Sequence, residues 1–253
     1  MPQYKKNFLN SVVVRIDFEA IDEGKVDNFL QTISATFPRK EKASAYNAEI
    51  KLSVEAEGQV AQQVNTKFDI WNLNTNDESK AGQISKNWLL VEYKKYKNSD
   101  VLLEDIERIF DKFLQYFNVV SIKRLGLMYN NIIKLTPSTQ PLEWAGYINP
   151  KLLSALDFAN DSGLALSGYT SQLVKYMPRS NVVFNYGMWN PDFPNQISRK
   201  EFLLQYDCFT NLEMEVSDIG LVEIFKDFNK QIEDIFEDSI EDQLRDLMGR
   251  EEA

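Results

Sequence analysis

The sequence predicts an α+β protein: two packed halves of largely antiparallel sheet, helices on one face, and a long amphipathic helix at the C-terminal end. Segments with apolar residues at alternate positions, typical of strands, occur in both halves. The expected order in the first half is strand, helix, three strands, helix, strand, which favours helices packed on one face of an antiparallel sheet. A hydrophobic share of 43%, with only 10 glycines and 8 prolines, is typical of a folded chain.

The first half, residues 1–135, opens with a strand at 11–18, where β-branched apolar residues alternate with charged ones. A helix at 25–37 follows, because its apolar residues recur at helical spacing and Pro38 ends it. The next strands are expected at 45–56, 64–73 and 80–96.

The clearest helix of this half spans 100–117, with one broad apolar face and Asp100 as a candidate N-terminal cap. A strand at 119–135 follows it, and Gly126 inside this strand indicates a bend, a bulge or a close backbone contact. The stretch 136–150 holds three of the eight prolines and is the expected connection between the halves.

The second half, residues 151–253, is expected to begin with a short helix at 151–159 and to continue as a β-meander. Its strands are predicted at 164–177, 180–190 and 200–212. A helix over 217–248 closes the chain, with apolar residues at every third or fourth position and acidic residues over the remaining surface. This pattern fits a helix packed on the core with a solvated outer face, and its length also fits a helix that binds a partner or dimerises.

The net charge of -10 lies entirely in residues 213–253, which hold 14 acids and 4 bases, whereas the preceding residues hold 24 of each. A chain without a basic excess does not attract phosphate backbones, so nucleic acid and anionic membranes are disfavoured as main partners. No apolar run approaches the length that spans a bilayer, and the N-terminal stretch lacks the features of a signal peptide. A cytoplasmic protein with no membrane partner is therefore expected.

The chain contains no histidine, the residue that most often serves as a general base or metal ligand near neutral pH. Sites built on Ser-His-Asp, Cys-His or His-ligated zinc are thereby excluded. The single cysteine, Cys208, cannot form an intramolecular disulfide and is expected to be a small buried side chain rather than a nucleophile. No phosphate loop, dinucleotide fingerprint or CxxC pattern occurs, so neither a cofactor nor a bound metal is expected.

Two clusters resemble a sporadically distributed, uncharacterised prokaryotic family of about this length. The first is a Trp-led strand that ends in tyrosine, WLLVEY at 88–93, and the second is an Arg-x-Gly-Leu-x-Tyr-x-Asn-x-Ile signature at 124–133. Met128, where the family usually has a second arginine, and Asn130, usually apolar, depart from it. The resemblance implies no settled activity, cofactor or substrate. The patchy distribution of such families is common for mobile-element and phage-defence genes, which is association rather than mechanism.

We therefore expect a protein that acts by protein-protein interaction or assembly, with a protein partner or as a homo-oligomer; catalysis of its own is less favoured. The candidate contact residues lie on the C-terminal helix and in the aromatic loop at 186–194: Trp189, Phe193, Phe228, Ile232, Glu233 and Glu237. The signature contributes Arg124, Gly126, Tyr129 and Asn131. A buried Arg124 would need a carboxylate partner, and that structural role is favoured over ligand binding.

Two alternatives come from different functional classes. Asp69, Glu92 and Lys94 could form a Mg²⁺ site of the restriction-endonuclease type, because carboxylates bind a hard cation and lysine stabilises charge. However, the same Glu-x-Lys pattern is common on the exposed face of an edge strand. Lysines around WLLVEY, with Trp88, Tyr93 and Tyr96 as stacking rings, could instead bind single-stranded nucleic acid.

Overall fold

The computed structural model describes residues 3–55, 58–210 and 213–251, and in this part of the chain ten strands form one antiparallel sheet. The strands lie in the order β3-β4-β5-β6-β2-β7-β10-β9-β8, and the short β11 pairs with the beginning of β7. They are β2 (Leu9–Phe18), β3 (Arg39–Glu55), β4 (Gly58–Asn74), β5 (Lys80–Ser85), β6 (Trp88–Tyr93), β7 (Ser121–Lys134), β8 (Tyr169–Tyr176), β9 (Ser180–Met188), β10 (Glu201–Thr210) and β11 (Met214–Glu215). The α+β class is confirmed.

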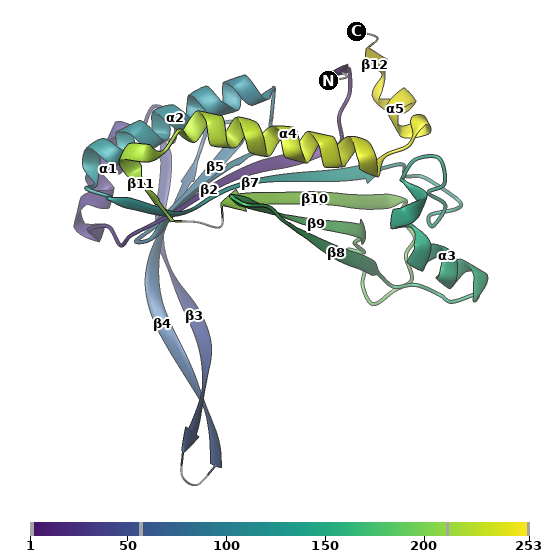
Figure 1. Ribbon diagram of the computed structural model, residues 1–253, viewed down its shortest axis with the longest axis horizontal. Coiled ribbons are helices and arrows are strands. Elements are labelled where there is room, and N and C mark those ends of the chain that lie inside the picture. The colour runs from purple at the N-terminus through teal and green to yellow at the C-terminus, as the bar shows by residue number, and fades with distance from the viewer. Residues whose placement is uncertain (1–2, 56–57, 211–212, 252–253) are drawn as a thin grey trace.

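The helices α1, α2 and α4 cover one face of this sheet (Figure 1). Apolar side chains at alternate positions of β2, such as Val12, Val14 and Ile16, are fully buried beneath them. The helices are α1 (Val26–Thr32), α2 (Ser99–Tyr116), α3 (Ser154–Asp161), α4 (Leu221–Ser239) and α5 (Asp242–Met248). Near the chain ends, β1 (Gln3–Tyr4) pairs with β12 (Arg250–Glu251). None of the described helices is long and apolar enough to cross a membrane.

A similar order of elements, with a strand, a helix, several strands and a second helix, occurs twice along the chain. The first series is β2, α1, β3 to β6 and α2, and the second is β7, α3, β8 to β10 and α4. In each series the last long strand returns to pair with the first, β6 with β2 and β10 with β7. The first strands of the two series, β2 and β7, pair with each other in the middle of the sheet. In this sheet β7, which belongs to the first predicted half, pairs directly with β10 of the second.

The hairpin of β3 and β4 is much longer than its neighbours. Its register runs from Arg39 opposite Asn74 to Glu55 opposite Gly58, but only residues 70–74 of β4 pair with β5. The rest projects away from the sheet and its helices (Figure 1). The hairpin is therefore a two-stranded ribbon that lacks further strand neighbours along most of its described length.

Two predicted elements are each divided into two in the structure. The single strand expected at 80–96 is the hairpin of β5 and β6, and the single helix expected at 217–248 is α4 followed by α5. Ile240 separates the helices, because its extended backbone forms a bridge to Ile148 and its side chain is buried. The cap of α2 is also Asn98 rather than Asp100, since the Asn98 side-chain oxygen accepts a hydrogen bond from the Val101 amide at 2.9 Å.

Replacing Tyr206 by phenylalanine is expected to leave the free energy of unfolding unchanged or to raise it by about 1 kcal/mol. Tyr206 is fully buried in β10, where its ring stacks on Phe184 at 4.7 Å. Its hydroxyl has no hydrogen-bond partner among the described residues, and Ser239 of α4 donates its own hydrogen to the Ile235 carbonyl oxygen. Removing the hydroxyl therefore removes an uncompensated polar group.

Urea denaturation of this variant beside Tyr93→Phe is the matched measurement. The Tyr93 hydroxyl donates to Asp105 at 2.9 Å, so its removal should lower the free energy of unfolding by about 1 kcal/mol. An equal loss in the two variants would show that the Tyr206 hydroxyl is satisfied.

Candidate functional site

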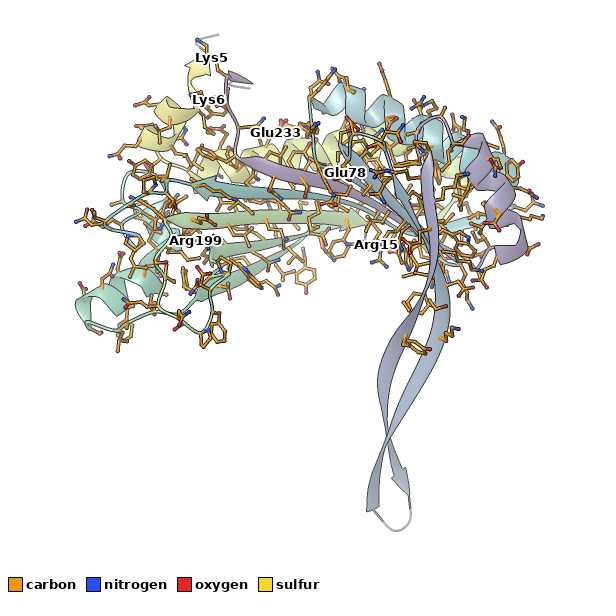
Figure 2. The ribbon with its side chains drawn as sticks, turned by 180° about the vertical axis from the view of Figure 1, so that it is seen from behind. Lys5, Lys6, Arg15, Glu78, Arg199 and Glu233 are labelled. Carbon is orange, nitrogen blue, oxygen red and sulfur yellow. The ribbon has the colours of Figure 1, made fainter. Side chains whose placement is uncertain are left out.

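The face of the sheet opposite α2 and α4, here called the open face, is hollowed and lined by side chains from most of the strands. Hollows of about 400, 350 and 420 Å³ lie on it, and they share lining residues such as Leu90 and Glu92 of β6. Figure 2 shows Arg15 of β2 on the side of the sheet away from Glu233 of α4. Because the hollows share walls, the open face is one extended surface rather than a set of separate pockets.

A cluster of two arginines and two aspartates occupies the middle of the open face. Arg124 of β7 reaches Asp207 of β10 at 3.0 Å and Asp17 of β2 at 3.9 Å, and Arg15 contacts Asp17 at 2.8 Å. The Arg124 guanidinium also lies 4.5 Å from the centre of the Phe209 ring. Burial raises the pKa of Asp207 against the opposing effect of Arg124, so this carboxyl is partly desolvated.

Gly126 provides the space in which the Arg124 side chain lies. A Cβ atom at Gly126 would be 2.8 Å from the Arg124 Nη1 atom, closer than non-bonded atoms approach. The first part of the signature is thereby explained, because the arginine folds over the glycine two positions along the same strand face. Its guanidinium reaches carboxylates on both neighbouring strands from there. The register between β2 and β7 shifts at Lys123, because Asp17 pairs with Arg124 and Phe18 pairs with Ile122. The bulge therefore lies at Lys123 and not at Gly126.

A continuous row of hydrogen-bonded side chains crosses five strands of the open face. Each member donates to the next over 2.7 to 3.1 Å, in the order Gln172 to Asn185 to Gln205 to Asn130 to Ser11. Successive members are direct cross-strand neighbours in the register of β8, β9, β10, β7 and β2. Each amide in this amide row carries two donor hydrogens and two acceptor lone pairs. The donor hydrogens and lone pairs that are not used within the row remain for a ligand on the surface.

Trp189, predicted from the sequence as a contact residue, lines the same hollow as Gln205 and Asn130 of the amide row. Its side chain is 70% exposed, and that of Phe193, four positions further along the loop, is 71% exposed. The structure thus places an accessible aromatic ring beside the amide row. Large exposed aromatic side chains are common anchors of protein interfaces.

The second part of the signature points to the helix-covered face. The Tyr129 hydroxyl lies 3.0 Å from that of Tyr96, and Asn131 donates to the Leu204 carbonyl at 3.3 Å. Arg124 and Gly126 therefore serve the open face, while Tyr129 and Asn131 pack beneath α4. The alternation of side chains along one unbroken strand separates the two pairs.

The expectation that Phe228 and Ile232 form a contact surface is corrected by their burial. They are 3% and 1% exposed, because the apolar stripe of α4 packs on the sheet. Glu237 is engaged within the protein as well, since it accepts from the Tyr4 hydroxyl at 2.8 Å and from Arg245 at 3.3 Å. Glu233 lines a cavity on this side of the sheet.

The three residues of the predicted Mg²⁺ site are not brought together. Asp69 contacts Lys42 at 2.8 Å and accepts from Ser44 at 3.0 Å. Glu92 lies on the open face. It is opposite Ala81 of β5, which is itself opposite Asn74, a residue several positions further along β4 than Asp69. Lys94 follows the end of β6. The nuclease arrangement is thus wrong for these residues. Strand β5 lies between β4, which carries Asp69, and β6, which carries Glu92, and the two carboxylates are also several positions apart along the strands.

The predicted stacking surface for single-stranded nucleic acid is not formed either. Trp88 faces the open side of β6, whereas Tyr93 is buried on the helix side and donates to Asp105. Tyr96 packs on Tyr129 with 5.6 Å between ring centres. The three rings therefore do not share a surface on which successive bases could stack.

Cys208 is fully buried in β10, and burial raises the pKa of its thiol to about 12. The reactive thiolate is therefore scarce at neutral pH, and access is blocked as well. We expect alkylation by iodoacetamide at pH 8 to be at least about 100-fold slower in the native protein than in denaturant. Equal rates, followed by intact mass, would contradict this placement.

No protein-family model matches the sequence, and no curated protein matches it. The amide row was not foreseen, because its members come from five separate segments. Only the strand order and register align them.

Proposed function

We propose that this protein acts without catalysis of its own, by binding a protein partner on the open face of its sheet. The amide row carries this proposal. Its unused amide donors and acceptors match those of a polypeptide, whose N–H and C=O groups alternate along the chain. A partner segment lying over the row could exchange hydrogen bonds with several strands at once.

The composition of the open face supports a protein rather than a phosphate-bearing partner. Protein interfaces are enriched in arginine, methionine and aromatic residues and depleted in lysine. The residues that line the hollows include Arg15, Arg124, Met128 and Trp189, and no lysine is among them. The acidic side chains there outnumber the basic ones, which disfavours a phosphate backbone. They are Asp17, Asp207, Glu41, Glu92 and Glu201.

The test is binding by variants of the open face. A protein retained by the purified chain from extracts of its own host is identified by mass spectrometry, produced separately and titrated by calorimetry. Trp189→Ala and Gln205→Ala should each weaken this complex at least about 10-fold, as expected for the loss of a central contact. Leu247→Ala removes exposed apolar surface on α5 and should leave the affinity unchanged.

Light scattering of the chain alone is the companion measurement. A homodimer that dissociates on Trp189→Ala or Gln205→Ala also supports the proposal, with a second copy as the partner. A monomer without a retained protein contradicts it, as does a complex that is insensitive to both open-face substitutions while circular dichroism shows the fold to be intact.

A further inference from the structure

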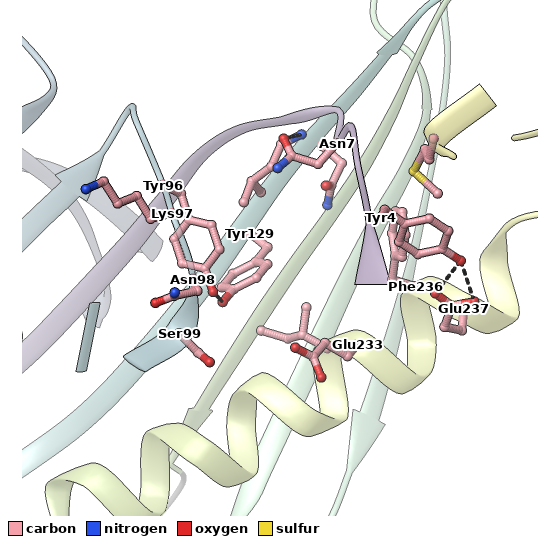
Figure 3. A pocket seen from close by; sticks show the side chains of 14 residues that line it. Tyr4, Asn7, Tyr96, Lys97, Asn98, Ser99, Tyr129, Glu233, Phe236 and Glu237 are labelled. Atoms are coloured by element: carbon pink, nitrogen blue, oxygen red, sulfur yellow. Dashed lines mark hydrogen bonds between the residues drawn. The ribbon is translucent and has the colours of Figure 1, made fainter. Parts of the chain in front are cut away.

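A cavity of about 470 Å³ lies on the helix-covered side, where the N-terminal segment and the loop before α2 meet β7 and α4. Its volume is within the range of small-molecule sites. Aromatic rings and a carboxylate define its interior: Tyr4, Tyr96, Tyr129, Phe236 and Glu233. In Figure 3, Tyr96 and Tyr129 lie on one side of Glu233, and Tyr4 and Phe236 lie on the other. The amide row plays no part here, because it lies on the opposite face of the sheet.

A chain of hydrogen bonds leads from the tyrosines to the Glu233 carboxylate. The Tyr129 hydroxyl lies 2.5 Å from the Asn229 side-chain oxygen and 3.0 Å from the Tyr96 hydroxyl. Since a phenol carries one hydrogen, Tyr129 donates to Asn229 and accepts from Tyr96. Asn229 in turn donates to the Oε1 atom of Glu233 at 2.7 Å. The side chains of Tyr129, Asn229 and Glu233 are thus held in place beside the cavity.

Glu233 differs from the other carboxylate of the cavity. Glu237 is paired with Arg245 at 3.3 Å, whereas no lysine or arginine of the described chain forms an ion pair with Glu233. Lys97 also lines the cavity, but its side chain is exposed and points away from Glu233 (Figure 3). Burial raises the pKa of Glu233, and the hydrogen bond from Asn229 and nearby positive charge, including that of Lys230, oppose this effect without removing it. A bound cation would compensate this partly desolvated charge.

We infer that this cavity binds a small organic ammonium compound, with its cation between the Glu233 carboxylate and the tyrosine rings. The faces of aromatic rings attract cations, and walls of several rings with an acidic residue are suited to substituted ammonium groups. The carboxylate supplies the opposite charge, while Phe236 and the tyrosine rings contact the apolar substituents.

Calorimetric titration of the full chain with choline and with 3,3-dimethyl-1-butanol tests the inference. The two probes have almost the same shape, but only choline is charged. Choline should bind at least about 10-fold more tightly, as cation–π and ionic attraction in a partly desolvated site require. Putrescine is titrated in parallel; binding of putrescine alone would support the site and assign it to primary amines.

Variants connect the binding to the cavity. Glu233→Gln keeps the shape and removes the charge, so choline affinity should fall at least about 10-fold. Glu104→Gln removes one carboxylate from the exposed surface of α2 and should leave the affinity unchanged. Equal binding of choline and its neutral analogue, absence of binding by every amine at millimolar concentration, or full affinity in Glu233→Gln would each overturn the inference. Because the wild-type titrations need no variant, a variant that fails to fold does not decide the outcome.

Discussion

Replacing Gly187 by alanine is expected to lower the free energy of unfolding by about 3 kcal/mol or more. Gly187 lies in β9 with a φ of +138°, a conformation that side chains other than glycine rarely adopt. A Cβ atom there would lie 2.2 Å from the carbonyl oxygen of Tyr169 in β8. Because this neighbour is backbone, the two strands would have to separate. Urea denaturation followed by circular dichroism measures the loss.

Gly168→Ala is the matched control for this prediction. A Cβ atom at Gly168 would meet no other atom within 4 Å, and its φ is not in the positive region. The free energy of unfolding should therefore change by less than about 0.5 kcal/mol. A loss for Gly187→Ala as small as that for Gly168→Ala would mean that the close approach of β8 and β9 is not a feature of the folded protein.

Asp105→Asn is the second substitution for which a large effect is expected, a loss of about 2 to 3 kcal/mol at neutral pH. Asp105 of α2 is bonded to Lys80 of β5, accepts from Tyr93 of β6 at 2.9 Å and accepts from Arg108 at 2.5 Å. Its side chain is only 11% exposed. The neutral side-chain amide of asparagine at position 105 would leave Lys80 as a mostly buried charge without its partner.

The effect of Asp105 should depend on pH in a defined direction. Burial by itself raises the pKa of this carboxyl, but the hydrogen bonds and charges of Lys80, Tyr93 and Arg108 outweigh it, and the pKa lies below its usual value. A carboxyl with a lowered pKa in the folded state stabilises the protein above its unfolded pKa and loses that contribution as the pH falls through the folded value. The difference in stability between wild type and Asp105→Asn should therefore shrink below about pH 4.

Asp111→Asn, on the exposed surface of the same helix, provides the control for both measurements. It should change the free energy of unfolding by less than about 0.5 kcal/mol at neutral pH. A constant difference between wild type and Asp105→Asn from pH 7 to pH 3 would show that the charge of Asp105 is not the stabilising element.

The periodicity of the sequence predicted the fold class and most of the elements, because alternation and helical spacing are local properties. The predicted strand at 80–96 was wrong because a two-residue turn at 86–87 lacks glycine, the usual signal for such a turn. The carbonyl groups of these residues accept from the Phe18 and Ile21 amides, contacts that only the folded chain supplies. Similarly, the break between α4 and α5 depends on the distant Ile148.

The sequence identified individual residues of the candidate site but not their arrangement. Trp189 was found from the aromatic composition of its loop, and Arg124 and Gly126 from the signature. Asn130 had only seemed a departure from that signature, yet it links β7 to β10 and β2 in the amide row. Such links require the order of strands, which brings together residues far apart in the chain.

The repeated order of elements has a consequence for synthesis of the chain on the ribosome. β7 covers the edge of β2 soon after α2 is made, but its other edge is covered by β10, which begins only at Glu201. Until then the nascent chain has a long strand edge with unpaired backbone groups, the feature through which β-proteins aggregate. A chain interrupted between β7 and β10 would keep that edge permanently. Premature termination in this interval should therefore produce aggregates rather than a smaller soluble unit.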